Sequence, residues 1–171
     1  MQHGSRIHSE QEMSDRTRAL SLNRMETTPV ILVAEDDPND VFFLRRAFQK
    51  AAVKCQIYDV PNGEEAISYL QGTPPYSNRA DYPFPQLLLL DLKMPLMGGF
   101  DVLEWLQGRL ELAELPALVL SSSGQDEDRT RARQLGARGY HVKPNELVQL
   151  TQLAQELAGN WLQSKALAGR L

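Results

Sequence analysis

The sequence has little of three features that often define a class of protein: cysteine, long apolar runs and an excess of positive charge. Its single cysteine, Cys55, excludes an internal disulfide framework and a zinc site made of cysteines, and its apolar and polar neighbours alternate in a way that favours a buried, inert thiol. No apolar run approaches the length of a membrane span and the N-terminus lacks the apolar core of a signal peptide, so we expect a cytoplasmic protein with no membrane partner. A formal net charge of -4 gives no basic field for a phosphate backbone, so we expect no nucleic acid partner.

The chain is long enough for one domain with a sizeable core, since 42% of its 171 residues are hydrophobic. Residues 1–28 are polar and show no sustained period, which predicts a poorly ordered N-terminal tail. The pattern changes at Pro29 and predicts one domain over 29–158. Residues 159–171 form a C-terminal extension, with a helix as one option for it.

Within 29–158, apolar runs of strand length alternate with segments of helical spacing. Helix signals include Pro38 after a probable cap at Asp37, and the pair Asn62 and Glu65, which resembles a capping box. The segment 72–85 contains four prolines and predicts a surface loop. Five strands alternating with five helices predict an α/β fold, a doubly wound five-stranded parallel sheet, for which we adopt the flavodoxin-like order 2-1-3-4-5. The strands are expected at 30–34, 54–60, 87–90, 117–120 and 139–142.

Polar side chains follow four of these strands directly. Glu35 and Asp36 follow the first, Asp91 the third, Ser121 the fourth and Lys143 the fifth. Open α/β sheets place their sites at the carboxyl ends of the strands, and in the order 2-1-3-4-5 these four strands are neighbours. The acids, the hydroxyl and the ammonium are therefore expected to line one cleft.

Three carboxylates so close together repel one another unless a positive group intervenes. Mg²⁺ prefers oxygen ligands at about 2.0 to 2.1 Å, usually one or two carboxylates with water and substrate phosphate, and this set of residues offers them. Lys143 adds a point charge that suits a phosphoryl oxygen. The cleft is therefore predicted to serve phosphoryl transfer.

Four segments, VAEDDP, LLLLDLKMP, LSSS and GYHVKP, in this order and spacing, resemble a response-regulator receiver domain over about residues 29 to 158. The insertion at 72–85 and the lack of an output domain further resemble the single-domain regulators that are paired with bacterial phytochrome-type histidine kinases. The resemblance implies a two-component signalling protein whose partner is a sensor histidine kinase.

By this resemblance, Asp91 attacks the phosphohistidine of the kinase and becomes an acyl phosphate. Glu35, Asp36 and Asp91 hold Mg²⁺, and the backbone carbonyl of Lys93 completes the set. The resemblance makes the protein a phosphoryl acceptor that catalyses only its own phosphorylation and dephosphorylation, and not an enzyme acting on other substrates. Asp37 is interpreted as a helix cap in preference to a metal ligand.

The remaining roles also follow from the resemblance. Ser121 would hydrogen-bond the attached phosphoryl group, and Tyr140 would turn inward with it, which couples the site to the surface of the fourth helix, fifth strand and fifth helix. A half-buried strand tyrosine is the equal alternative for Tyr140. Lys143 would enter the cleft through a cis bond to Pro144. Three residues that would tune the site and alter the lifetime of the phosphoryl group are Lys93, Ser122 and Ser123.

Trp161 and Leu162 continue the apolar stripe of the last helix, which predicts either packing back on the domain or a dimer contact; we favour a homodimer through this C-terminal face.

Two other functions are the alternatives to a phosphoryl-accepting receiver domain. A haloacid-dehalogenase-type phosphatase uses a similar set of residues, but there the nucleophile opens the chain in an Asp-x-Asp pattern, whereas position 93 is Lys here. A degenerate receiver that only binds partners would lack some of the needed residue types, and all are present.

Overall fold

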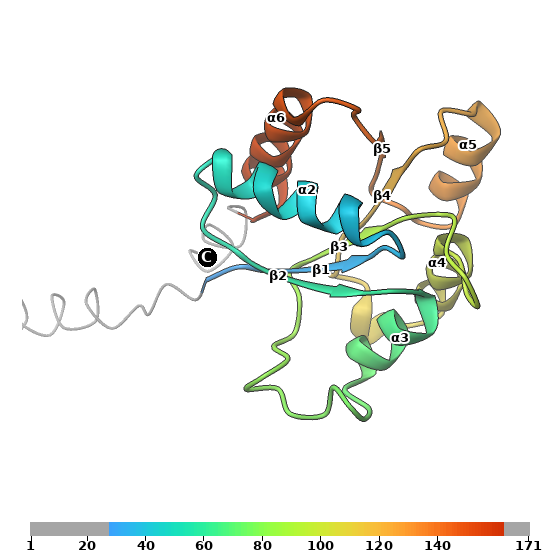
Figure 1. The fold of residues 1–171 in the computed structure, drawn as a ribbon. Coiled ribbons are helices and arrows are strands. Elements are labelled where there is room, and N and C mark those ends of the chain that lie inside the picture. The colour runs from blue at the N-terminus through green and yellow to red at the C-terminus, as the bar shows by residue number, and fades with distance from the viewer. Residues whose placement is uncertain (1–27, 163–171) are drawn as a thin grey trace, which may run out of the picture.

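The computed structural model describes residues 28–162 of the chain. Five parallel strands form one sheet in the order β2-β1-β3-β4-β5, with helices on both faces (Figure 1). The predicted fold class and strand order are confirmed. The strands are β1 (Val30–Ala34), β2 (Gln56–Val60), β3 (Leu87–Leu90), β4 (Ala117–Ser121) and β5 (Gly139–Val142). The helices are α2 (Pro38–Lys50), α3 (Gly63–Gln71), α4 (Gly99–Gln107), the 3₁₀ turn η1 (Leu110–Leu112), α5 (Asp126–Gln134), α6 (Leu147–Leu157) and the π-helical turn η2 (Ala158–Leu162).

The central strands are apolar throughout because both of their faces are covered. In β3, Leu87 and Leu89 pack in the core on one side of the sheet, whereas Leu88 and Leu90 pack in the core on the other side. All four are at most 1% exposed. Successive strand side chains point to opposite faces, so a strand covered on both sides must be a continuous apolar run.

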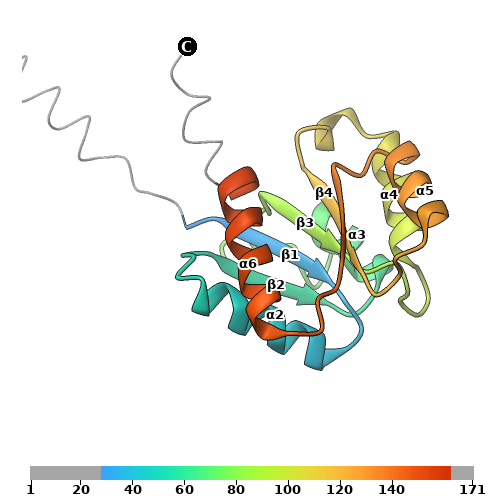
Figure 2. The ribbon, with the colours of Figure 1, turned by 90° about the horizontal axis from the view of Figure 1, so that it is seen from above.

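Helices cover both faces of the sheet (Figure 2): α2 and α6 contribute to the core on one face, and α3, α4 and α5 contribute to the core on the other. Helices α2 and α6 lie side by side on the first face, where Phe48 and Leu157 are almost completely buried. Helices α3, α4 and α5 supply Tyr69, Val102 and Ala132 to the core on the second face. This arrangement leaves the carboxyl ends of the strands uncovered by helices.

Local signals in the sequence set the helix ends. The Asp37 side chain accepts a hydrogen bond from the backbone N–H of Asn39 at 2.8 Å and caps α2, so the interpretation of Asp37 as a cap is confirmed. Asn62 caps α3 in the same way by accepting from the N–H of Glu65 at 2.9 Å. The helix α3 ends at Gly72, whose φ of 69° suits glycine.

The loop 72–85 is tied to the second face of the domain. The Arg79 guanidinium donates hydrogen bonds to the carbonyls of Tyr69 and Leu70, each at 2.8 Å, at the C-terminal end of α3. The hydroxyl of Tyr76 donates to Glu65 at 2.6 Å, and Tyr82 packs edge-on to Tyr76 with ring centroids 5.1 Å apart. The loop therefore satisfies free carbonyls of α3 and extends the core with aromatic rings.

The end of the described chain packs back onto the domain. Leu162 is buried, and Trp161 packs against the core beneath α2 and α6. The structure thus shows the back-packing expected for this apolar stripe, and the dimer contact stays a prediction. Two predicted segments lie mostly outside the described residues: residues 1–27 of the N-terminal tail and residues 163–171 of the C-terminal extension.

Three further expectations can be compared with the structure. The second strand begins at Gln56 rather than at residue 54. The expected cis bond before Pro144 is wrong, since Pro74–Pro75 is the cis peptide bond found within residues 28–162 and Lys143 reaches the cleft without one. No helix in the described part of the chain is long and apolar enough to cross a membrane.

Candidate functional site

Sheet hydrogen bonds hold the residues that follow the strands. The N–H of Asp91 donates to the carbonyl of Ala34 at 2.9 Å, and the N–H of Lys143 donates to the carbonyl of Ser121 at 2.8 Å. Glu35 is fixed likewise by a bond from its N–H to the carbonyl of Val60 at 2.9 Å. The hydrogen-bonded ladder of the sheet therefore extends to the candidate site and positions the backbone of these residues.

Carboxylates from two loops converge at this edge of the sheet. Oxygens of Glu35, Asp36 and Asp91 all lie within 4.8 Å of one another. Glu35 and Asp91 are buried, at 8% and 6% exposure, whereas Asp36 is exposed. The structure therefore brings together the three acids that the sequence selected as metal ligands.

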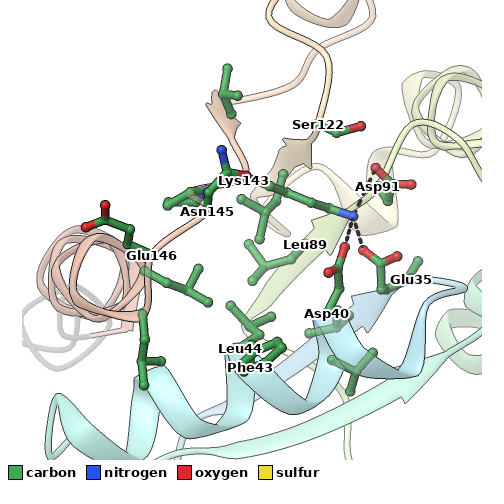
Figure 3. A pocket seen from close by; sticks show the side chains of 18 residues that line it. Glu35, Asp40, Phe43, Leu44, Leu89, Asp91, Ser122, Lys143, Asn145 and Glu146 are labelled. Carbon is green, nitrogen blue, oxygen red and sulfur yellow. Dashed lines mark hydrogen bonds and ion pairs between the residues drawn. The ribbon is translucent and has the colours of Figure 1, made fainter.

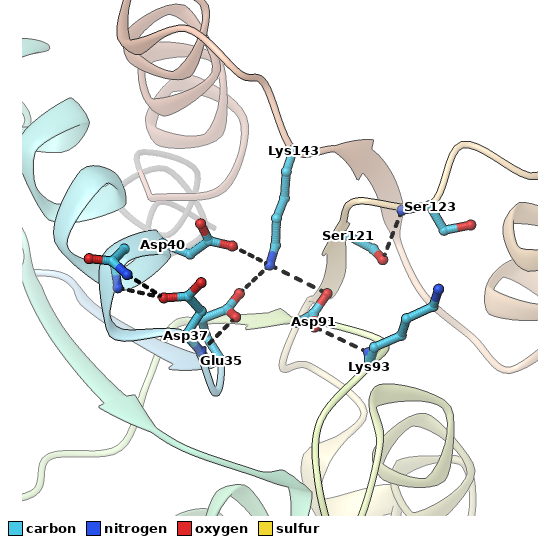
Figure 4. Close-up of polar contacts among 9 residues, drawn as sticks. Glu35, Asp37, Asp40, Asp91, Lys93, Ser121, Ser123 and Lys143 are labelled. Carbon is cyan, nitrogen blue, oxygen red and sulfur yellow. Dashed lines mark hydrogen bonds and ion pairs between the residues drawn. The ribbon is translucent and has the colours of Figure 1, made fainter.

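Asp91 lies at the centre of the cluster with one oxygen unsatisfied. Its Oδ2 accepts a hydrogen bond from the backbone N–H of Lys93 at 3.1 Å. Its Oδ1 is buried and accepts no hydrogen bond, although the Lys143 ammonium lies 3.6 Å away (Figure 4). A buried carboxylate oxygen without a partner is unfavourable, and such exceptions in folded proteins often mark a functional group or an ion site.

Lys143 enters from β5 and contacts acids on two other elements. Its Nζ lies 2.5 Å from Glu35 Oε2 and 2.7 Å from Asp40 Oδ2 (Figure 3). Asp40 was not among the residues selected from the sequence. This residue lies in the first turn of α2, where an acid stabilises the helix dipole and needs no further role to explain it. One feature of the sequence could have indicated Asp40: α2 begins directly after the acids that follow β1, so its first turn lies next to the site.

The pKa values of Glu35 and Lys143 are both raised, but by different causes. Burial raises the pKa of Glu35 above its ordinary value, and hydrogen bonds from Lys143 and from the Asp37 N–H oppose this shift without cancelling it. Burial alone would lower the pKa of Lys143, but its hydrogen bonds to Asp40 and Glu35 outweigh burial and hold the pKa above its ordinary value. Lys143 is therefore positively charged at neutral pH, beside carboxylates that need a positive neighbour.

The serines at the end of β4 and the predicted switch residue form a second group. Ser121 is fully buried, and its Oγ accepts from the N–H of Ser123 at 3.3 Å. The hydroxyl of Tyr140 donates to the carbonyl of Ser123 at 2.9 Å, and the Arg129 guanidinium lies 4.9 Å from the centre of its ring. Tyr140 is half-buried and contacts the Ser121 loop through Ser123.

A groove of about 480 Å³ opens beside the acids (Figure 3). One wall is polar, with Lys143 and Asp91, and the other is apolar, with Phe43 and Leu44 of α2 and Leu150 of α6. Sequence reasoning did not predict this groove, because its walls come from segments about a hundred residues apart.

The donor set fits a hard divalent cation. Its side-chain ligands are all carboxylate oxygens, two of them buried, and the unpartnered Oδ1 of Asp91 faces the cluster. Mg²⁺ and Mn²⁺ prefer such oxygens, whereas zinc and copper favour histidine or cysteine, which are missing from this cluster.

Known proteins share both the sequence pattern and the fold. Residues 31–155 match the model of the response regulator receiver domain. The chain is 28% identical over 138 residues to the response regulator Rcp1 of Synechocystis, covering 81% of this chain and 92% of Rcp1. A structure of the phosphorylated cyanobacterial phytochrome response regulator RcpA is similar with a TM-score of 0.73 at 29% identity, covering 81% of this chain and 96% of RcpA.

A response regulator in red light signaling of R. palustris has a TM-score of 0.76 at 30% identity, covering 80% of this chain and 95% of that protein. The Mn²⁺-bound form of Rcp1 has a TM-score of 0.70 at 26% identity, covering 80% and 96%. The chain belongs to the response regulator receiver domain family. It is a two-component signalling domain whose relatives include phytochrome response regulators.

Proposed function

We propose that Asp91 accepts a phosphoryl group from the phosphohistidine of a sensor histidine kinase. The observation that carries this proposal is the Oδ1 of Asp91, which is buried, has no hydrogen-bond donor and lies 3.6 Å from the Lys143 ammonium. In the reaction, a carboxylate oxygen of Asp91 forms a bond to phosphorus while the bond from phosphorus to the kinase imidazole breaks, and that imidazole leaves with its electron pair. A carboxylate is a competent nucleophile without a general base.

The residues around Asp91 would stabilise the transferring group. Glu35 and Asp36 would hold Mg²⁺ with Asp91 and the carbonyl of Lys93, and the cation, when bound, supplies positive charge to the phosphoryl oxygens. The family fit and the Mn²⁺-bound form of Rcp1 support a divalent cation here, and Mg²⁺ itself is our proposal. Lys143 would contact a phosphoryl oxygen, and Ser121 would donate a hydrogen bond to another.

Phosphorylation would act on the surface of α5, β5 and α6 through Tyr140. Its hydroxyl holds the carbonyl of Ser123, two residues beyond Ser121, so a shift of Ser121 toward a phosphoryl group would disturb this bond. Tyr140 would then turn inward. Lys93, Ser122 and Ser123 would tune the decay of the phosphoryl group, and a changed decay rate in Lys93→Ala would support this role.

We infer that the kinase partner is of the phytochrome type, because phytochrome response regulators are among the relatives and structural neighbours. The homodimer remains a prediction, and a chain cut after residue 158 tests it by sedimentation: retained association would refute a contact through the C-terminal face. A cytoplasmic location and the absence of a nucleic acid partner also remain predictions from the sequence.

One experiment tests the proposed function against its rivals. The protein is incubated with Mg²⁺ and acetyl phosphate, and intact mass is measured. We expect a mass increase of one phosphoryl group that is stable in acid, labile in alkali and lost in Asp91→Asn, whereas the exposed Asp126→Asn retains it. A phosphatase would turn over the donor without a stable adduct, and a degenerate receiver would do neither.

A further inference from the structure

Asp40 is a fourth acid at the site that the metal cluster does not include. The three carboxylates that can share a cation are Glu35, Asp36 and Asp91. Asp40 lies in the first turn of α2, and its side chain is 42% exposed. Its Oδ2 contacts the Lys143 ammonium at 2.7 Å, so Lys143 lies between Asp40 and the cluster (Figure 4).

Lys143 and a divalent cation compete for the same carboxylate. One oxygen of Glu35 accepts from the Asp37 N–H at 3.1 Å, and the other is paired with the Lys143 ammonium at 2.5 Å. A cation bound to Glu35 must therefore share or displace this ammonium, and two positive groups so close together repel. The side chain of Lys143 is only 18% exposed, so an ammonium released from Glu35 without another partner would be unfavourable.

We propose that Asp40 is the positioning residue that holds the Lys143 ammonium when a divalent cation takes the Glu35 carboxylate. Asp40 offers an oxygen already in contact with Nζ and belongs to no group of metal ligands found in the described chain. Lys143 already donates a hydrogen bond to Asp40 and can keep this bond when its bond to Glu35 is lost, without a large movement of the side chain. Asp40 thereby lowers the cost of metal binding while keeping Lys143 beside Asp91. This inference rests on the proposed cation site.

The test compares Asp40→Asn with Asp37→Asn. Both variants remove one negative charge from the first turn of α2 or its cap, and Asn at position 37 keeps the cap, but only Asp40 contacts Lys143. Mg²⁺ alone is titrated into each protein by isothermal titration calorimetry, and Mn²⁺ binding is followed independently by electron paramagnetic resonance. We expect Asp40→Asn to weaken binding by about two- to five-fold, the upper part of the range for a partly exposed ion pair, and Asp37→Asn to change it by less than about two-fold. Asp40→Glu, which keeps a carboxylate within reach of Lys143, is expected to restore most of the affinity.

A second measurement separates this role from general stabilisation of α2. In a double-mutant cycle of Asp40→Asn and Lys143→Met, the coupling in urea unfolding is expected to persist in saturating Mg²⁺. A coupling that vanishes in Mg²⁺, or equal losses of Mg²⁺ affinity in Asp40→Asn and Asp37→Asn, would overturn the role of Asp40 while the proposed function stands. A wild-type chain that takes up neither cation would overturn the cation site and this inference together.

Discussion

Replacing Lys143 by methionine tests whether the buried carboxylates of the site need the positive charge of the ammonium for stability. Methionine keeps an unbranched apolar stem and removes only the ammonium, which lies 2.5 Å from Glu35 and 3.6 Å from Asp91. Both carboxylate side chains are 6% exposed, so the variant leaves two buried negative charges without their cation.

The size of the effect follows from this burial. Removing one partner of a fully buried ion pair costs about 3–5 kcal/mol, but Lys143 is 18% exposed and water screens part of the loss, so we expect a fall of about 1–3 kcal/mol in the free energy of unfolding without metal. A divalent cation at the same carboxylates replaces the missing charge in the variant, whereas in the wild type it binds beside the Lys143 ammonium, so Mg²⁺ is expected to stabilise the variant more than the wild type. In saturating Mg²⁺ the deficit should therefore shrink to less than about 1 kcal/mol.

The assay is urea unfolding at pH 7.5, followed by the fluorescence of Trp105 and Trp161, in EDTA and in saturating Mg²⁺. Lys54→Met, at an exposed lysine with no ion pair within residues 28–162, is the control and should change neither value. Equal stability of Lys143→Met and the wild type in EDTA would refute the reasoning. So would a deficit that grows when Mg²⁺ is added.

Three further predictions concern the loop of Asp91, the sheet and the half-buried His141. Gly99→Ala would place a Cβ 2.3 Å from the carbonyl oxygen of Asp91, so we expect the free energy of unfolding to fall by about 1–3 kcal/mol and phosphorylation by acetyl phosphate to slow. The control is Gly108→Ala, whose Cβ would lie in open space and should be tolerated. Equal behaviour of the two variants would contradict this prediction. Leu89→Ala, at a side chain that is 1% exposed, should cost about 2–5 kcal/mol in urea unfolding, and a loss below about 1 kcal/mol would mean that β3 is not packed on this face. Burial lowers the pKa of His141 in the folded state, so its contribution to stability is complete above the unfolded pKa, near 6.5, and is lost as the pH falls through the folded value. His141→Gln should therefore flatten stability between pH 7.5 and 5.5, and an unchanged pH profile would count against this assignment.

The strands and the acids at their ends were predictable because they depend on local pattern, whereas the order 2-1-3-4-5 was adopted from the flavodoxin-like fold. A run such as Leu87–Leu90 fits only a strand covered on both faces, and parallel strands must bring their carboxyl ends to one edge. Asp91 therefore had to lie near Glu35 once β1 and β3 were neighbours. The register of β3 on β1 then fixes the position of Asp91, because its N–H donates a hydrogen bond to the carbonyl of Ala34.

Asp40 and the groove could not be read from the pattern, because both depend on distances across the fold. The contact of Asp40 with Lys143 joins residues 103 positions apart and requires both the start angle of α2 and the side-chain path of Lys143. The prediction of a cis bond before Pro144 is wrong, since the long side chain of Lys143 reaches the acids with a trans peptide. The apolar stripe at Trp161 predicted either packing on the domain or a dimer contact; the structure shows the packing of η2 against the core, and the homodimer stays a prediction.

The sequence by itself determined the sheet, its polar edge and the residue types of a phosphoryl-acceptor site, since these follow from periodicity and from the direction of parallel strands. Only the tertiary structure decided how the charges at that edge are shared. One ammonium serves Glu35, Asp40 and Asp91 together, and one oxygen of Asp91 is left without a hydrogen bond. The physical reason is that electrostatic balance depends on separations of a few ångströms between atoms from distant segments, and only the folded chain sets these separations.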